Sequence, residues 1–230
     1  MNAAEELPGE RALATRTPAH AWAEMQQGNL RFVSGVPGHP RQDVERREQL
    51  LDKQMPQAAL FGCSDSRLAA EIIFDLGLGD LFVVRNAGQI ISDSVIGSLE
   101  YAVAVLNVPL IVVLGHDECG AVRAAIDSQS PDAVALPPHI RRLIEKIIPA
   151  VKRTTAASEA GGASEAGGAS TAEPDSTEVG REHLRDTVAE LLETSELISD
   201  AIAGGTLALV GANYRLLEGR AVPDIIVGTV

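Results

Sequence analysis

Residues 61–67 read Phe61-Gly62-Cys63-Ser64-Asp65-Ser66-Arg67, where an apolar run gives way to a helical pattern. The second of the chain's two cysteines follows another apolar run, in the segment Gly115-His116-Asp117-Glu118-Cys119-Gly120. The ends of two strands therefore present Cys63, His116 and Cys119, three ligands suited to Zn²⁺. A fourth ligand of this type is not evident in the sequence, which favours a catalytic metal site over a structural one.

The spacing of the three residues supports this interpretation. His116 and Cys119 are three positions apart, so one turn can direct both at a single ion, and Cys63 would arrive from another strand. Taken singly, each cysteine fits a small buried hydrophobic residue equally well, and His116 fits a core histidine with its hydrogen bonds satisfied. Their joint occurrence after two strands favours zinc.

Asp65 and Arg67 stand at alternate positions, so in an extended segment they point the same way. A bidentate pair between them would fix the carboxylate and lower its proton affinity. Beside a metal, such a carboxylate can accept a hydrogen bond from zinc-bound water and orient the hydroxide. Two other readings stay open, namely an ordinary surface ion pair and an N-cap of the following helix by Asp65.

Near-continuous apolar strands alternate with helical patterns along the chain, which predicts an α/β fold with a mostly parallel central sheet of four to five strands flanked by helices. Strands are expected at 58–61, 81–84, 110–114 and 206–211, with 225–227 as a fifth, edge strand. Helices are expected from Thr17-Pro18 to Gly35 and at 43–51, 68–76, 93–106, 119–126 and 136–151. The two cysteine motifs then lie at the carboxyl ends of the first and third strands, where open α/β sheets place their ligands.

The sequence predicts one domain with two irregular parts. Residues 1–17 read as a disordered or loosely packed arm, and residues 18–230 as a single zinc-binding α/β domain. Within it, a Gly/Ala/Ser/Glu-rich segment at about 154–177 contains Ala-Ser-Glu-Ala-Gly-Gly twice in tandem. Because this segment has no apolar side chain larger than alanine, it cannot offset its ordering entropy, and a flexible loop between two helices is expected.

Composition narrows the class of protein. The 230 residues are 45% hydrophobic, enough for one full core, and the formal net charge is −13. This acidity argues against a nucleic-acid or anionic-membrane partner, since both require lysine and arginine. An apolar stretch of membrane-spanning length or a signal peptide is not apparent, so a cytoplasmic location is expected.

The combination of Cys-Ser-Asp-Ser-Arg with His-x-x-Cys-Gly resembles the β-class carbonic anhydrases. The resemblance covers roughly residues 18–151 and 179–219, and its further segments are 29–32, 79–88, 98–103, 112–116 and 209–214. It implies reversible hydration of carbon dioxide to bicarbonate by zinc-bound hydroxide, with one Zn²⁺ per chain on Cys63, His116 and Cys119. It also implies that Asp65 and Arg67 are the catalytic pair that orients the hydroxide. In some members the aspartate binds the zinc and closes the site, and the motif fits both arrangements.

The resemblance also extends to substrate and assembly. It implies a pocket for CO₂ and bicarbonate lined by Gln54, Phe82 and Tyr101, which supply an amide donor and an apolar wall. In the family this pocket is completed across a dimer interface, so a homodimer or homotetramer is expected.

Two other functions fit the same motifs. One is a noncatalytic zinc-bearing relative that senses bicarbonate or serves in an assembly, and the other is a hydrolase of another small heterocumulene. All three ligands and both members of the Asp–Arg pair are present, which favours the carbon dioxide hydratase.

Overall fold

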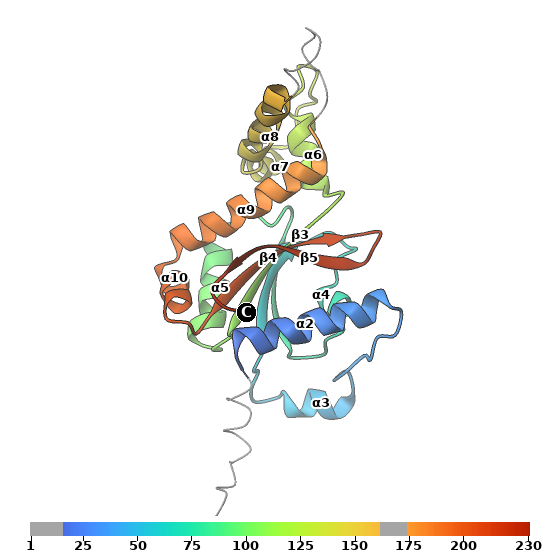
Figure 1. Ribbon diagram of the computed structural model, residues 1–230, viewed down its shortest axis with the longest axis vertical. Helices are drawn as coiled ribbons and strands as arrows, with labels where there is room; N and C mark the ends of the chain where they lie inside the picture. Colours follow the sequence, from blue (N-terminus) through green and yellow to red (C-terminus); the bar gives the residue numbers. More distant parts are fainter. Residues whose placement is uncertain (1–15, 162–173) are drawn as a thin grey trace, which may run out of the picture.

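The computed structural model describes residues 16–161 and 174–230. Its centre is a five-stranded sheet in the order β2-β1-β3-β4-β5 (Figure 1). The strands are β1 (Ala58–Cys63), β2 (Leu81–Asn86), β3 (Leu110–His116), β4 (Ala208–Arg215) and β5 (Arg220–Val227). The first four run parallel, and β5 pairs antiparallel with β4 at the edge. The predicted mostly parallel sheet is confirmed, and each parallel strand continues beyond its apolar run to the carboxyl edge.

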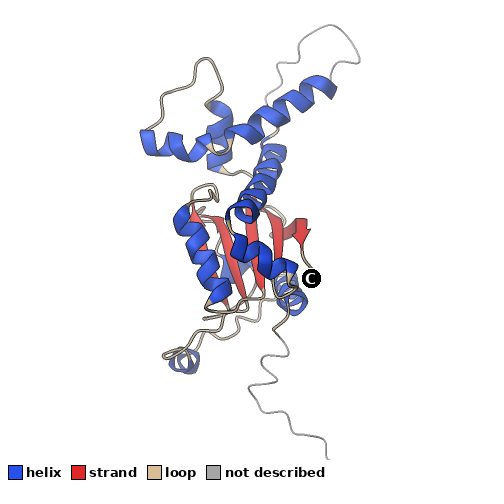
Figure 2. Ribbon diagram, turned by 90° about the vertical axis from the view of Figure 1, so that its left-hand side faces the viewer, coloured by secondary structure: helices blue, strands red, loops and turns tan. Residues whose placement is uncertain are grey.

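The described helices are α2 (Pro18–Val33), α3 (Val44–Gln49), α4 (Ala70–Ile73), α5 (Asp93–Ala104), α6 (Gly120–Asp127), α7 (Pro138–Glu145), α8 (Ile148–Gly161), α9 (Ser176–Thr194) and α10 (Glu196–Ala203). Thr17 caps α2, because its side chain accepts a hydrogen bond from His20 N. Helices pack on both faces of the sheet (Figures 1 and 2). None of the helices in the described part of the chain has the length and apolar character that crossing a membrane requires.

Two predicted helices differ from the structure. The one expected at 68–76 is reduced to α4, because Asp75 adopts a φ of 45° while its carboxylate accepts hydrogen bonds from the backbone N–H groups of Gly38 and His39. The one expected at 136–151 is split into α7 and α8. Pro149 lies in the first turn of α8, where its missing N–H is tolerated, but it cannot continue α7.

The structure describes part of each segment that was expected to be irregular. Helix α8 continues to Gly161, so residues 154–161 of the expected loop are helical, with Thr154 buried and bonded to Ala150 O. At the other end of this loop α9 begins at Ser176. Arg16, in the expected arm, donates to Pro56 O at 2.8 Å. The remainder of the two predictions, residues 1–15 and 162–173, lies outside the described residues.

The core is divided by the sheet into two layers and a cap. Alternate strand residues, such as Leu60 and Val112, pack under α2 and α4, whereas their neighbours, such as Phe61 and Val113, pack under α5, α9 and α10. A third apolar cluster joins α6, α7 and α8 to Cys63 and Cys119. These three helices lie beyond the carboxyl end of the sheet (Figure 1), and their apolar side chains pack with the two cysteines.

Gly28 allows α2 to pack closely on α4. A Cβ at this position would collide with the Phe74 carbonyl oxygen, which is backbone and cannot rotate away. We expect Gly28→Ala to lower the free energy of unfolding by about 2 kcal/mol, as overpacked sites do. Urea denaturation measures this, with Gln27→Ala on the exposed side of the same helix as the control. Equal denaturation midpoints for the two variants would contradict the close packing.

Candidate metal centre

Three buried side chains meet at the carboxyl edge of the sheet. Cys63 ends β1, His116 ends β3 and Cys119 is the N-cap residue of α6. Their ligand atoms all lie within 4.8 Å of one another. The register explains the meeting, because Gly62 on β1 faces Leu114 on β3, so both strands end at the same level. The structure thus brings together the three residues that the sequence predicted as metal ligands.

The His116 ring is oriented with one nitrogen unused. Its Nδ1 lies 2.7 Å from the carbonyl oxygen of Asp117, and because a carbonyl only accepts, Nδ1 carries the proton. The Nε2 lone pair is buried and has no hydrogen-bond partner among the described residues. Leaving such an acceptor unsatisfied costs about 1–3 kcal/mol. A backbone carbonyl on one imidazole nitrogen and a free lone pair on the other is the arrangement found around metal ions.

The two thiols share one negative charge. The hydrogen bond from the Cys119 thiol is the main reason that the pKa of Cys63 falls to about 4, against the opposing effect of burial. The same contact, together with burial, raises the pKa of Cys119 above its ordinary range. The second proton therefore leaves only when a cation offsets the added charge. Two sulfurs and one imidazole nitrogen form a donor set that fits Zn²⁺.

Asp65 is held by Arg67 beside this cluster. Arg67 donates from Nε to Oδ1 at 2.8 Å and from a terminal nitrogen to Oδ2 at 2.7 Å, and its backbone N–H also reaches Oδ1. These hydrogen bonds hold the pKa of the Asp65 carboxyl well below its usual range. Of the two arrangements open to the motif, the structure has the aspartate paired with arginine.

Two arginines tie the site's loops together. Arg67 donates to the Glu118 carbonyl oxygen at 3.1 Å and so connects the loop after β1 to the loop after β3. Arg85, near the end of β2, donates to the carbonyl oxygens of Cys63 and Asp65 at 2.8 and 2.6 Å. This role of Arg85 was not predicted from the sequence. The only available signal was a guanidinium at the carboxyl edge of a parallel strand.

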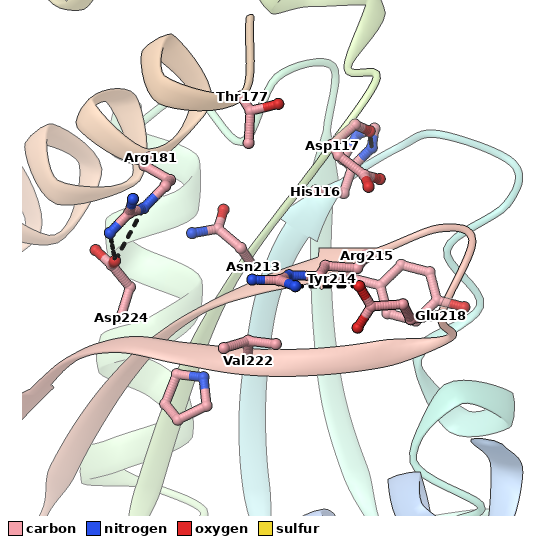
Figure 3. Close-up of a pocket in the computed structure, with 11 residues that line it drawn as sticks. His116, Asp117, Thr177, Arg181, Asn213, Tyr214, Arg215, Glu218, Val222 and Asp224 are labelled. Atoms are coloured by element: carbon pink, nitrogen blue, oxygen red, sulfur yellow. Dashed lines mark hydrogen bonds and ion pairs between the residues drawn. The ribbon is translucent and has the colours of Figure 1, made fainter. Parts of the chain in front are cut away.

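A separate cavity of about 460 Å³ lies between α9 and the β4–β5 hairpin (Figure 3). His116 and Asp117 line one side of it, but neither cysteine is among its lining residues. Arg181 is paired with Asp224 at 3.0 Å on one side of the cavity, and Arg215 is paired with Glu218 at the same distance on the other side (Figure 3). Both arginines of the cavity are thus paired within the chain, and Asp117 Oδ1 accepts a hydrogen bond from the backbone N–H of Leu216.

Comparison with known proteins identifies the family. Residues 58–221 match the profile of a family described as carbonic anhydrase. The chain belongs to the carbonic anhydrase family. It is 48% identical over 207 residues to carbonic anhydrase 2 of Mycobacterium tuberculosis, which covers 89% of this chain and 92% of that protein. It is 45% identical to a carbonic anhydrase of Mycolicibacterium smegmatis, with 88% and 91% covered.

Solved structures agree on the fold. A β-carbonic anhydrase from Sordaria macrospora, described as tetrameric, superposes with a TM-score of 0.64 at 23% identity and covers 95% of this chain and 97% of its own. A second, from Aspergillus fumigatus, has a TM-score of 0.66 at 20% identity, with 94% and 90% covered. The resemblance to the β-class carbonic anhydrases inferred from the two cysteine motifs is confirmed, and with it the expectation of an enzyme.

The three residues predicted to line the substrate pocket of this carbonic anhydrase lie away from the Cys63–His116–Cys119 cluster of the same chain. Phe82 faces Ala59 at the start of β1, and the four residues from there to Cys63 span about 13 Å. Tyr101 on α5 has its ring centroid 6.1 Å from that of Phe82, and Gln54 is exposed just before β1. The structure therefore places Phe82 and Tyr101 together near the amino-terminal ends of the strands, whereas the cysteines lie at the carboxyl-terminal ends.

Glu118 separates two ligands and has a φ of 51°, a left-handed conformation that glycine adopts without strain. Its side chain is exposed, whereas its carbonyl oxygen binds Arg67.

We expect Glu118→Gly to bind as much zinc as the parent, with a free energy of unfolding within about 1 kcal/mol of the parent value. Glu118→Val should lower stability by about 1–2 kcal/mol, because a β-branched residue resists positive φ. Thermal unfolding measures the stability of the two variants, and metal analysis measures their zinc content. Equal stability of the glycine and valine variants would contradict the conclusion that the positive φ at position 118 constrains the residue there.

Proposed function

We propose that this chain catalyses the reversible hydration of carbon dioxide to bicarbonate at a zinc site formed by Cys63, His116 and Cys119. The observation that carries the proposal is the buried Cys–His–Cys cluster beside a carboxylate held by arginine. Membership in the carbonic anhydrase family supports the reaction.

The ligand residues suit one divalent cation per chain. Two thiolates would balance the charge of Zn²⁺, and the neutral imidazole would add its free Nε2 lone pair. When bound, zinc supplies the Lewis acidity that makes water a nucleophile near neutral pH. Burial of all three side chains keeps bulk water from competing for the ligands.

Asp65 would orient the attacking oxygen. Its carboxylate stays ionised because Arg67 lowers its pKa, so it accepts hydrogen bonds and does not donate them. An O–H of the nucleophile directed at Asp65 leaves an oxygen lone pair free to face the carbon of CO₂. The new C–O bond forms as one C=O π pair moves onto oxygen, and a proton leaves to solvent, so that CO₂ and water yield bicarbonate and H⁺.

Asp65→Asn tests this role. The amide keeps the shape, but it places an N–H group where a carboxylate oxygen accepts from Arg67 or from the nucleophile. We expect zinc content and thermal stability close to the parent and a fall of about a hundredfold in stopped-flow CO₂ hydration. Glu190→Gln, which removes an exposed ion pair with Lys146, is the matched control and should retain activity. Parental turnover in Asp65→Asn would rule out the proposed role.

We also propose that Gln54, Phe82 and Tyr101 serve the metal centre of a second copy of the chain, in a homodimer or homotetramer. β2 is an edge strand, and all six of its residues are at least partly exposed, whereas β1 and β3 are buried throughout. Exposed apolar side chains lie on the segment before β1, on α4 between β1 and β2, and on α5 with its C-cap residue: Leu51, Met55, Ile72, Tyr101 and Val105. A lone chain leaves these side chains in water, and a second copy would cover them.

Subunit mixing provides the test. Asp65→Asn and Tyr101→Ala homodimers should each be impaired, since each lacks one part of every site. In a mixed dimer one site carries both substitutions and the other carries none. Random mixing makes about half of the dimers mixed, so about a quarter of all sites are restored. Activity that does not rise after mixing and reassembly would contradict a shared site, and mixing each variant with itself is the control.

A further inference from the structure

His183 is a buried polar side chain that the ligand set and the Asp65–Arg67 pair do not include. It lies on α9, which crosses the sheet near the ends of β3 and β4 (Figure 1). The residue is 3% exposed, and its Nε2 lies 2.7 Å from the carbonyl oxygen of Gly88. The same helix passes His116 at Gly180, whose Cβ would stand 4.0 Å from the His116 carbonyl oxygen. Helix α9 thus contacts the loop after β2 at Gly88 and the end of β3 at the ligand residue His116.

Gly88 connects His183 to the metal centre. While its carbonyl accepts from His183, its own N–H donates to Cys63 Sγ at 3.4 Å, and both bonds are buried. Gly88 has a φ of 80°, and a Cβ there would lie 2.9 Å from the Ala121 side chain. Glycine is therefore required for the close approach, but glycine is also the residue least able to keep a conformation by itself.

The chemistry of the imidazole shows that this contact is more than packing. Because a carbonyl only accepts, Nε2 of His183 carries the ring proton and Nδ1 holds a lone pair. That Nδ1 is buried and without a hydrogen-bond partner in the described part of the chain. Such an unsatisfied acceptor is unfavourable, and an apolar side chain of similar volume would avoid it. Among the described residues, the imidazole makes a single hydrogen bond, to Gly88 O, and this bond explains a histidine at this place.

We propose that His183 is a positioning residue for the metal centre: it holds the Gly88 carbonyl so that the Gly88 N–H stays bonded to Cys63 Sγ. A hydrogen bond to a thiolate withdraws electron density from sulfur and fixes its direction, and the loss of such outer contacts weakens metal binding. The inference rests on the proposed zinc site and adds a residue from a distant helix to it.

Three variants separate the hydrogen bond from packing. His183→Gln keeps an N–H donor at about the reach of Nε2, His183→Asn carries the same amide on a shorter side chain, and His183→Leu removes the donor. Each is loaded with Co²⁺ in place of zinc to record the sulfur-to-cobalt charge-transfer absorption. Zinc affinity is measured in parallel by competition with a chromophoric chelator.

We expect His183→Leu and His183→Asn to bind zinc at least about tenfold more weakly and to shift the charge-transfer band to lower energy. His183→Gln should stay near the parent in both measurements. Leu191→Ala, at a fully buried position of the same helix, is the control: it should lower stability and leave the spectrum unchanged.

Three results would overturn the proposal: a parental spectrum and affinity in His183→Leu and His183→Asn, a glutamine variant no better than asparagine, or an equal spectral shift in Leu191→Ala. If His183→Leu does not fold, the glutamine and asparagine pair decides the question. The proposed function fails separately, since a parent protein that binds cobalt but hydrates no carbon dioxide leaves the His183 comparison intact.

Discussion

The parallel register of β1 and β3 is the constraint on which the rest of the structure depends. Gly62 and Leu114 face each other, so the two strands end together and deliver Cys63 and His116 to one place. A slip of one residue would turn Cys63 to the other face of the sheet, because side chains alternate along a strand. The apolar layers on both faces oppose such a slip, since every core side chain of β1 would move with it.

The charge of the Cys63–His116–Cys119 cluster explains why several hydrogen-bond donors surround it. Two buried thiols share one negative charge, and the histidine Nε2 lone pair beside them has no hydrogen-bond partner among the described residues, so the three ligands together attract a cation. Hydrogen bonds from outside keep the three ligands together despite this. Arg67 joins the loops after β1 and β3, Arg85 holds the carbonyl of Cys63, and His183 holds the glycine that donates to its sulfur. A site restrained in this way needs little rearrangement to take a cation.

Under the proposed function, the separation between the two ends of the strands would link catalysis to assembly. Ligands and the Asp65–Arg67 pair occupy the carboxyl edge, whereas Phe82 and Tyr101 meet at the other. The parallel arrangement keeps the two sets of residues apart, because the starts of neighbouring strands lie at one end of the sheet and their carboxyl ends at the other. A pocket that uses both sets therefore requires two copies, and the partly exposed β2 edge is the surface that a second copy would cover.

The sequence by itself determined the fold class and the members of the metal cluster. Apolar runs of strand length between helical patterns specify a parallel sheet, and Cys63, His116 and Cys119 all follow such runs, so their meeting was predictable. Only the tertiary structure decided the brevity of α4, the edge of the sheet on which Phe82 and Tyr101 lie, and the parts played by Arg85 and His183. These depend on hydrogen bonds and contacts between residues far apart in the chain. Local periodicity does not predict such contacts, because it indicates which face of a helix or strand a side chain occupies and not which distant atom it contacts.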